Sequence, residues 1–148
     1  MSDLVTSFEE ELATHGTLIY RNRGVSMMPM LRQDRDLMVI EQRPEGRCRK
    51  YDVVLYKRND QYILHRILKV LPDGYVICGD HNWKKDPIVR EEQILGRLVS
   101  FVRDGREISA ENPLYQCYVH LWCDLFPVRA LLLRTRSKMG KIRRRMTG

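Results

Sequence analysis

The sequence predicts a mainly β protein: an irregular antiparallel β-domain with a short helix at its N-terminal end and amphipathic, basic helices at its C-terminal end. Three observations predict this class. Short β-branched segments separated by turn residues fill the region from Thr17 to Val102. Helix-forming residues precede this region, and an apolar spacing of three to four residues follows it. With 148 residues, 43% of them hydrophobic, the chain has the size of one domain with a single core.

The expected elements follow one another at short intervals. Residues 3–14 are rich in helix formers and predict a helix that ends near His15-Gly16. Turn sequences such as Pro44-Glu45-Gly46, Asn59-Asp60 and Pro72-Asp73-Gly74 then separate β-forming segments. We expect strands at 17–23, 36–40, 52–56, 61–70, 75–78 and 94–102. Such short connections favour antiparallel hairpins.

Beyond Asn112-Pro113 the pattern changes to helix. The expected apolar face consists of Leu114, Tyr118, Leu121, Trp122 and Leu125. Asp124 is expected to cap a second helix, with Pro127 in its first turn. The chain thus divides into a β-domain over residues 1–112 and a basic, amphipathic helical appendage over 113–148.

The net charge of +7 belongs to the end of the chain. From residue 129 onward there are eight basic residues and no acidic one: Arg129, Arg134, Arg136, Lys138, Lys141, Arg143, Arg144 and Arg145. The rest of the chain, with 18 basic and 19 acidic residues, is nearly neutral. This distribution argues against a nucleic-acid-binding body.

The start of the chain and the cysteines indicate a cytoplasmic protein. Residues 1–11 have neither the basic start nor the apolar stretch of a secretory signal, and no run of eighteen apolar residues predicts a membrane span. Four cysteines, Cys48, Cys78, Cys117 and Cys123, show no metal-ligand spacing. We expect free thiols in a reducing compartment, no metal and no cofactor.

A serine motif carries the strongest chemical signal. In Gly24-Val25-Ser26-Met27-Met28-Pro29-Met30-Leu31, Ser26 is followed by Met, Pro and Leu at fixed offsets. This segment resembles the nucleophile box of signal peptidases and of the self-cleaving repressors of the SOS type. Read alone, the segment also fits an ordinary loop serine beside a proline.

Further blocks follow in the order of that family. They are the strands at 36–40, 51–56, 64–67 and 94–99, and the loop Gly79-Asp80-His81-Asn82. The resemblance covers about residues 17–103. It implies a signal-peptidase-like catalytic domain within residues 1–112, and a serine endopeptidase without cofactor that lacks the family's N-terminal membrane anchor.

The resemblance assigns His65 as the general base, in the slot that is lysine in most bacterial signal peptidases and histidine in the endoplasmic-reticulum and archaeal-like branch. An imidazole has an ordinary pKa near 6.5, so it accepts a proton at neutral pH without strong burial. Lys57 and Lys69 are nearby alternatives outside the family slot. A structural histidine on a strand is the competing interpretation.

Two aspartates complete the expected site. Asp86 matches the residue that orients the histidine in that branch, and a carboxylate there would fix the imidazole tautomer. Gly79 and Asp80 match the glycine-aspartate loop, where we expect Asp80 to hold the loop through local hydrogen bonds. Either aspartate also fits a solvated turn. His81 and Lys84-Lys85 depart from the usual loop.

The oxyanion formed during acyl transfer needs donors. The Ser26 backbone N–H is the expected first donor. Many relatives have a serine two residues before the nucleophile, and this chain has Gly24 there. A cysteine-protease interpretation built on Cys78 and His81 is weaker, because Cys78 ends an apolar run and is expected to pack as a small hydrophobe.

We therefore expect a Ser/His endopeptidase that cleaves a peptide or precursor protein bound in extended form. The alternative is an inactive peptide-binding or membrane-docking module on the same fold; a self-acting regulatory domain would need a linker and a DNA-binding domain that we do not recognise. The tail leaves three possibilities open: peripheral contact with an anionic membrane, plain solvation and nucleic-acid binding. The sequence does not specify an oligomeric state.

Overall fold

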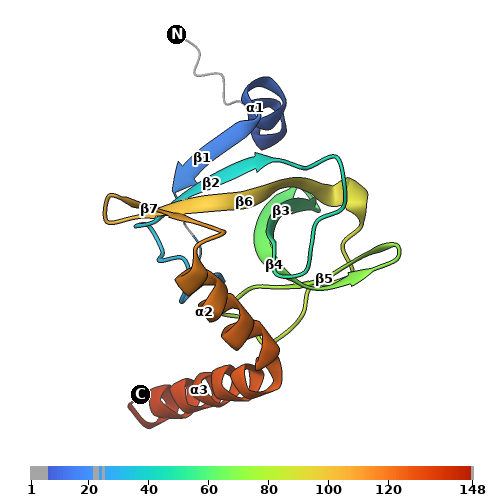
Figure 1. Cartoon of the computed structure of the whole chain (residues 1–148). Helices are drawn as coiled ribbons and strands as arrows, with labels where there is room; N and C mark the ends of the chain where they lie inside the picture. Colours follow the sequence, from blue (N-terminus) through green and yellow to red (C-terminus); the bar gives the residue numbers. More distant parts are fainter. Residues whose placement is uncertain (1–6, 22–23, 25, 148) are drawn as a thin grey trace.

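The computed structural model describes residues 7–21, 24 and 26–147. Within these residues it contains one antiparallel sheet of seven strands, a short helix before the sheet and two helices after it (Figure 1). The expected strands and flanking helices are confirmed. The class is mixed α/β rather than mainly β, because the three helices are nearly as extensive as the sheet.

The first helix, α1, spans Phe8–His15. Ser7 caps it in a reciprocal arrangement with Glu10, in which each side chain accepts a hydrogen bond from the other residue's backbone N–H. Gly16 ends it in the left-handed region at φ 70°. Leu12 points into the core. The expected helical residues 3–6 lie outside the described part of the chain.

The strands are β1 (Thr17–Arg21), β2 (Leu37–Gln42), β3 (Val53–Arg58), β4 (Gln61–Leu71), β5 (Gly74–Cys78), β6 (Ile94–Arg103) and β7 (Arg106–Ser109). Their order is β1-β2-β6-β3-β4-β5. β6 pairs with β2 along one edge and with β3 and β7 along the other. A short 3₁₀ helix, Glu91–Gln93, leads into β6. β1 and β5 are the two ends of this order.

β7 is absent from the expected elements. It forms a hairpin with β6 through Asp104 and Gly105, whose φ angles of 50° and 79° lie in the left-handed region. A turn of this kind suits an Asp-Gly pair because glycine has no Cβ and aspartate tolerates that region. The sequence therefore contained a hairpin signal that the analysis of strand patterns missed.

Two groups of apolar side chains form the interior. The larger one joins α1, the sheet and α2 around the segment after Ser26, and includes Met27, Met30, Leu31, Met38 and Phe101. The smaller one lies among β3, β4 and β5 and includes Val54, Tyr56, Ile67, Tyr75 and Ile77. The segment that carries Ser26 is thereby fixed on the larger core, while β3 and β4 belong to both.

α2 spans Pro113–Asp124 and is capped by Asn112, whose side chain accepts hydrogen bonds from two backbone N–H groups. Its inward residues are Tyr115, Val119 and Cys123, whereas Leu114 and Leu121 are 82% and 67% exposed. The predicted apolar face was therefore wrong in part. The reason lies in polar groups beneath the helix, the buried ion pair of Arg66 and Asp80.

α3 spans Phe126–Thr147 and follows α2 after a single residue, Leu125. Asp124 is the last residue of α2, where its side chain accepts a hydrogen bond from Tyr51 at 2.7 Å, so its predicted role as the cap of the second helix was wrong. α3 runs across the molecule at the end opposite α1 (Figure 1). Over the described residues no helix combines the length and apolarity needed to cross a membrane.

Candidate active site

Ser26 and His65 line one cavity of about 400 Å³, although they come from distant parts of the chain. Ser26 lies in the turn after β1, and His65 lies on β4 opposite Val54 of β3. Gly24 and Asn82 also line this cavity. The remaining walls are apolar or aromatic and consist of Phe8, Tyr20, Met27, Met38, Tyr62, Ile63 and Leu64. The two residues predicted to carry the chemistry thus share one site.

His65 is bonded to Asp86, as the resemblance implied. Its Nδ1 lies 2.5 Å from Asp86 Oδ2, and the two side chains are only 10% and 9% exposed. Asp86 is held in place because its backbone N–H donates to the Ile77 carbonyl at 2.8 Å. A carboxylate at Nδ1 favours the tautomer with its proton on Nδ1, which leaves Nε2 as the basic nitrogen.

A second donor reaches the same carboxylate oxygen. The Tyr56 hydroxyl, on a fully buried side chain of β3, donates to Asp86 Oδ2 at 2.5 Å. Burial raises the pKa of the Asp86 carboxyl, but the hydrogen bonds from His65 and Tyr56 outweigh burial and hold that pKa below its usual value. Burial and the same carboxylate raise the pKa of the Tyr56 phenol. Sequence patterns gave no role to Tyr56.

His65 Nε2 and the Ser26 carbonyl oxygen both lie close to Gly79. A Cβ added to Gly79 would lie 2.9 Å from His65 Nε2 and 2.6 Å from the Ser26 carbonyl oxygen, closer than any side chain tolerates. Gly79 is therefore the residue that lets the loop, the imidazole and the Ser26 segment approach one another. This is a steric role for a residue that the resemblance placed only in the loop.

The loop after β5 holds Ser26 directly. The His81 backbone N–H donates to the Ser26 carbonyl at 2.7 Å, and the Asn82 N–H donates to the Gly79 carbonyl at 3.0 Å. In the described part of the chain, neither the Ser26 side chain nor its N–H forms a hydrogen bond. Catalytic hydrogen bonds are often long in structures without substrate, so this geometry is compatible with a nucleophile and its base.

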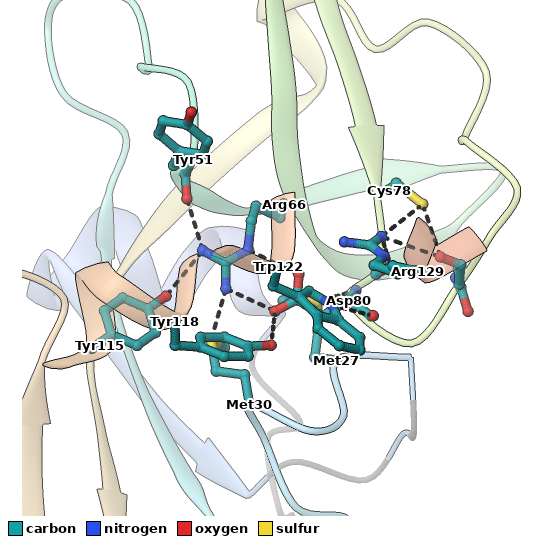
Figure 2. Close-up of polar contacts among 12 residues, drawn as sticks. Met27, Met30, Tyr51, Arg66, Cys78, Asp80, Tyr115, Tyr118, Trp122 and Arg129 are labelled. Carbon is teal, nitrogen blue, oxygen red and sulfur yellow. Dashed lines mark hydrogen bonds and ion pairs between the residues drawn. The ribbon is translucent and has the colours of Figure 1, made fainter. Parts of the chain in front are cut away.

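Asp80 lies on the other side of β4 from His65 and forms a fully buried ion pair with Arg66 (Figure 2). Both of its carboxylate oxygens accept hydrogen bonds from the Arg66 guanidinium at 2.8 Å. Adjacent residues of a strand face opposite sides, so His65 and Arg66 serve two separate groups. The expected local hydrogen bonds of Asp80 are replaced by contacts with β4 and α2.

Every N–H of the Arg66 guanidinium has an acceptor (Figure 2). Besides Asp80, the acceptors are the Tyr51 carbonyl, the Tyr115 hydroxyl and the Met30 sulfur, at 2.9–3.1 Å. Burial alone would lower the pKa of this guanidinium, but the Asp80 carboxylate outweighs it and the pKa is raised. The cation is therefore compensated within the core.

Two methionines of the serine motif contact this buried pair. The Met30 sulfur accepts from Arg66 at 2.9 Å, and the Met27 sulfur accepts from the Asp80 backbone N–H at 3.4 Å. These contacts tie the turn that carries Ser26 to the loop of Gly79 and Asp80. The methionines in the motif thus have a positioning role that their spacing alone did not reveal.

Helices α2 and α3 complete the support of the loop. The Tyr118 hydroxyl donates to the Asp80 carboxylate at 2.9 Å, and Trp122 Nε1 donates to the Asp80 carbonyl at 2.7 Å. Arg129 of α3 donates to the carbonyls of Gly79 and Asn82 at 3.0 and 3.1 Å (Figure 2). These polar contacts explain why Tyr115, Tyr118 and Trp122 face inward while leucines of α2 face outward.

A second anchor fixes the far end of the serine turn. The fully buried Asp36 carboxylate accepts from Arg103 at 2.9 Å and from the Arg32 backbone N–H at 2.9 Å. Arg103 also donates to the Met30 carbonyl. Burial raises the pKa of Asp36, but these donors outweigh it and the pKa lies below its usual value of 3.8.

The alternative bases and nucleophiles are placed elsewhere. Lys57 pairs with Glu9 at 3.0 Å, and Lys69 lines a separate cavity beside Cys123. Cys78 is fully buried, and burial raises the pKa of its thiol to about 11, which disfavours the nucleophilic thiolate. No hydrogen bond between Cys78 and His81 is present in the described part of the chain. His81 contributes its backbone rather than its ring.

The described residues suggest no metal site, and comparisons with known proteins give no match. The described residues contain no group of three or more His, Cys, Asp or Glu side chains that could hold a metal ion. No protein-family model matches the sequence, and no curated protein is significantly similar to it.

Proposed function

We propose that this protein is a serine endopeptidase of the signal-peptidase-like class, with Ser26 as nucleophile, His65 as general base and Asp86 as the group that orients His65. The observation that carries the proposal is the buried 2.5 Å contact between His65 Nδ1 and Asp86, on an imidazole that lines the same cavity as Ser26. The motif around Ser26 and the order of the blocks that follow it support the same assignment.

The proposed reaction proceeds through an acyl-enzyme. Ser26 Oγ attacks the carbonyl carbon of the scissile peptide bond while its proton passes to His65 Nε2. The Ser26 N–H stabilises the oxyanion, and Asp86 stabilises the imidazolium. The proton then passes from Nε2 to the leaving nitrogen as the C–N bond breaks. Water, deprotonated by His65, hydrolyses the ester and restores Ser26.

The surroundings of the site support a peptide bound in extended form. β1 leads to Ser26 and is one end of the strand order, so a peptide could pair with its outer edge. The apolar and aromatic walls of the cavity suit an apolar substrate side chain beside the cleaved bond. We propose as substrate the leader of a small bacterial peptide or a membrane-proximal precursor, processed in the cytoplasm.

The second candidate function is an inactive peptide-binding module. It is favoured by the lack of a hydrogen bond from the Ser26 hydroxyl in the described part of the chain, and by Gly24, which offers no hydroxyl to the oxyanion. Such a module would keep the cavity and the strand edge and lose only the chemistry.

Labelling with a fluorophosphonate tests the proposal. The purified chain, Ser26→Ala and His65→Ala are treated in parallel, and the modified residue is located by mass spectrometry. An adduct on Ser26 that is absent from both variants supports the peptidase. Because the reagent must enter the cavity, the same three proteins are also incubated with a peptide library. A folded protein that neither labels nor cleaves any peptide would favour the binding module.

A further inference from the structure

α3 carries a stripe of exposed apolar side chains that Thr135 interrupts once. Its members are Val128, Leu132, Met139, Ile142 and Met146, each between 54% and 81% exposed. Their spacing of three, four or seven residues places them on one face of the helix. The first turns of α3 contact the rest of the protein through Arg129, Ala130 and Leu133, which lie on a different face. The stripe therefore points away from the body.

Basic residues flank this stripe on both sides. At 100° per residue, Arg136 and Arg143 lie along one border, and Arg134, Lys138 and Arg145 lie along the other. α3 contains no acidic residue. An apolar face bordered by cations is the pattern of a helix that lies in the plane of a membrane surface. With 22 residues, α3 is about 33 Å long.

The charges of α3 select its partner. A second copy of the chain would bring another basic helix against this one, so like charges would face each other along both borders. A nucleic acid would satisfy the cations but leave the apolar stripe in water. The surface of an anionic bilayer satisfies both, because headgroups attract the basic borders and the interfacial region accepts the apolar side chains.

We propose that α3 docks flat on an anionic membrane surface and buries the stripe of Val128, Leu132, Met139, Ile142 and Met146 at the headgroup boundary. The proposal depends on α3 alone and is independent of the proposed peptidase chemistry. It requires no membrane span, in agreement with the absence of one from the described helices.

Vesicle cosedimentation tests this docking. The full chain is mixed with vesicles of phosphatidylcholine, or of phosphatidylcholine with phosphatidylglycerol. We expect binding to the anionic vesicles, weaker at high salt because screening reduces the electrostatic attraction. Ile142→Asp and Leu132→Asp place a charge within the stripe. The matched control, Ser137→Asp, makes the same charge change at an exposed position on the other side of α3.

The control variant should lose at most about fivefold in affinity, the value for one charge at the membrane surface, because its charge lies on the far side of the helix. The stripe variants should lose at least about tenfold more, because they also remove apolar burial. Equal losses in Ser137→Asp and Ile142→Asp would overturn the proposal, and so would a wild-type chain that does not sediment with anionic vesicles. Tighter binding to a duplex oligonucleotide than to vesicles would overturn it as well. Circular dichroism checks that all variants remain folded.

Discussion

Asp86 Oδ2 lies 2.5 Å from His65 Nδ1, and both side chains are almost completely shielded from water. Replacement of Asp86 by Asn preserves the size of the side chain but removes the charge that stabilises an imidazolium. If the proposed chemistry is correct, Asp86→Asn should slow fluorophosphonate labelling of Ser26 by about 10²- to 10⁴-fold. Mass spectrometry of timed samples measures the rate. An unchanged rate would contradict the assigned role of Asp86.

The variant Tyr56→Phe tests whether Tyr56 positions Asp86, because it leaves the charge of the Asp86 carboxylate unchanged. The variant removes one hydrogen bond to Asp86 and leaves the His65 contact in place. We expect about a tenfold slower labelling rate, the value of one hydrogen bond, and a smaller defect than in Asp86→Asn. Tyr75→Phe, whose buried hydroxyl donates to Glu91 and which does not line the cavity, is the control and should label close to the wild-type rate.

Gly79→Ala tests the close approach of the loop to the site. The added Cβ would lie 2.6 Å from the Ser26 carbonyl oxygen and 2.9 Å from His65 Nε2, so the loop or Ser26 must move. We expect a lower melting temperature and loss of labelling. Gly46→Ala, where a Cβ meets nothing within 4 Å, makes the same chemical change and should leave both properties unchanged. Equal behaviour of the two variants would refute the steric role.

Removal of one partner of the buried ion pair between Asp80 and Arg66 should lower the free energy of unfolding strongly. Asp80→Asn leaves the Arg66 guanidinium without its counter-charge in the core and should cost about 3–5 kcal/mol of unfolding free energy. Glu9→Gln, in the partly exposed pair with Lys57, should change that free energy far less. Urea unfolding measures both. Because Asp80 also supports the loop, labelling of Ser26 should fall in Asp80→Asn even at temperatures where the variant is folded.

The lowered pKa of Asp36 predicts that part of the free energy of unfolding is lost in acid. Its pKa is lowered in the folded protein, so the unfolded chain binds the proton more tightly. The stabilisation is therefore complete above the unfolded pKa of 3.8 and is lost as the pH falls through the lower folded value. Asp86 acts in the same direction. Urea unfolding between pH 3 and pH 6 should show a weaker pH dependence for Asp36→Asn than for the wild type; parallel curves would exclude this contribution.

Thiol reagents distinguish the serine and cysteine interpretations. Cys48, Cys78 and Cys123 are buried, and burial raises each thiol pKa to about 11, whereas Cys117 is exposed. Iodoacetamide should therefore modify Cys117 in the native protein and spare the other three. Cleavage or labelling at Ser26 should continue after this modification. Loss of activity upon alkylation of Cys78 would instead support a cysteine nucleophile.

The positions of the strands could be predicted from the sequence, because strand formation depends on residue patterns within a few positions. The expected 52–56 and 94–102 correspond to β3 and β6, since β-branched runs and the turn residues between them act over a few residues. The residues on the inward face of α2 could not be predicted in this way. Its apolar spacing placed Leu121 on the same face as Tyr118, but Leu121 is 67% exposed. The buried Arg66 guanidinium and Asp80 carboxylate require hydrogen-bonding side chains, and Tyr115, which was not predicted, lies on the inner face with Tyr118.

The sequence predicted the two residues that share the cavity, but not the residues that support them. Ser26 and His65 were identified by a motif and by the order of blocks, and the structure places them on one cavity. The supporting roles of Tyr56 and Met27 could not be predicted in this way. Their roles depend on strand register and on contacts with residues 30 or more positions away, for which a single sequence without strand pairing gives no signal.

Arg129 places a cation of the last helix on two carbonyls of the loop beside Ser26. Contacts of this kind can couple binding at two sites, and the coupling free energy between the sites is then the same in both directions. A ligand that changes the free energy of these two hydrogen bonds when it binds α3 would therefore change affinity in the cavity, and binding in the cavity would change affinity at α3 by the same factor.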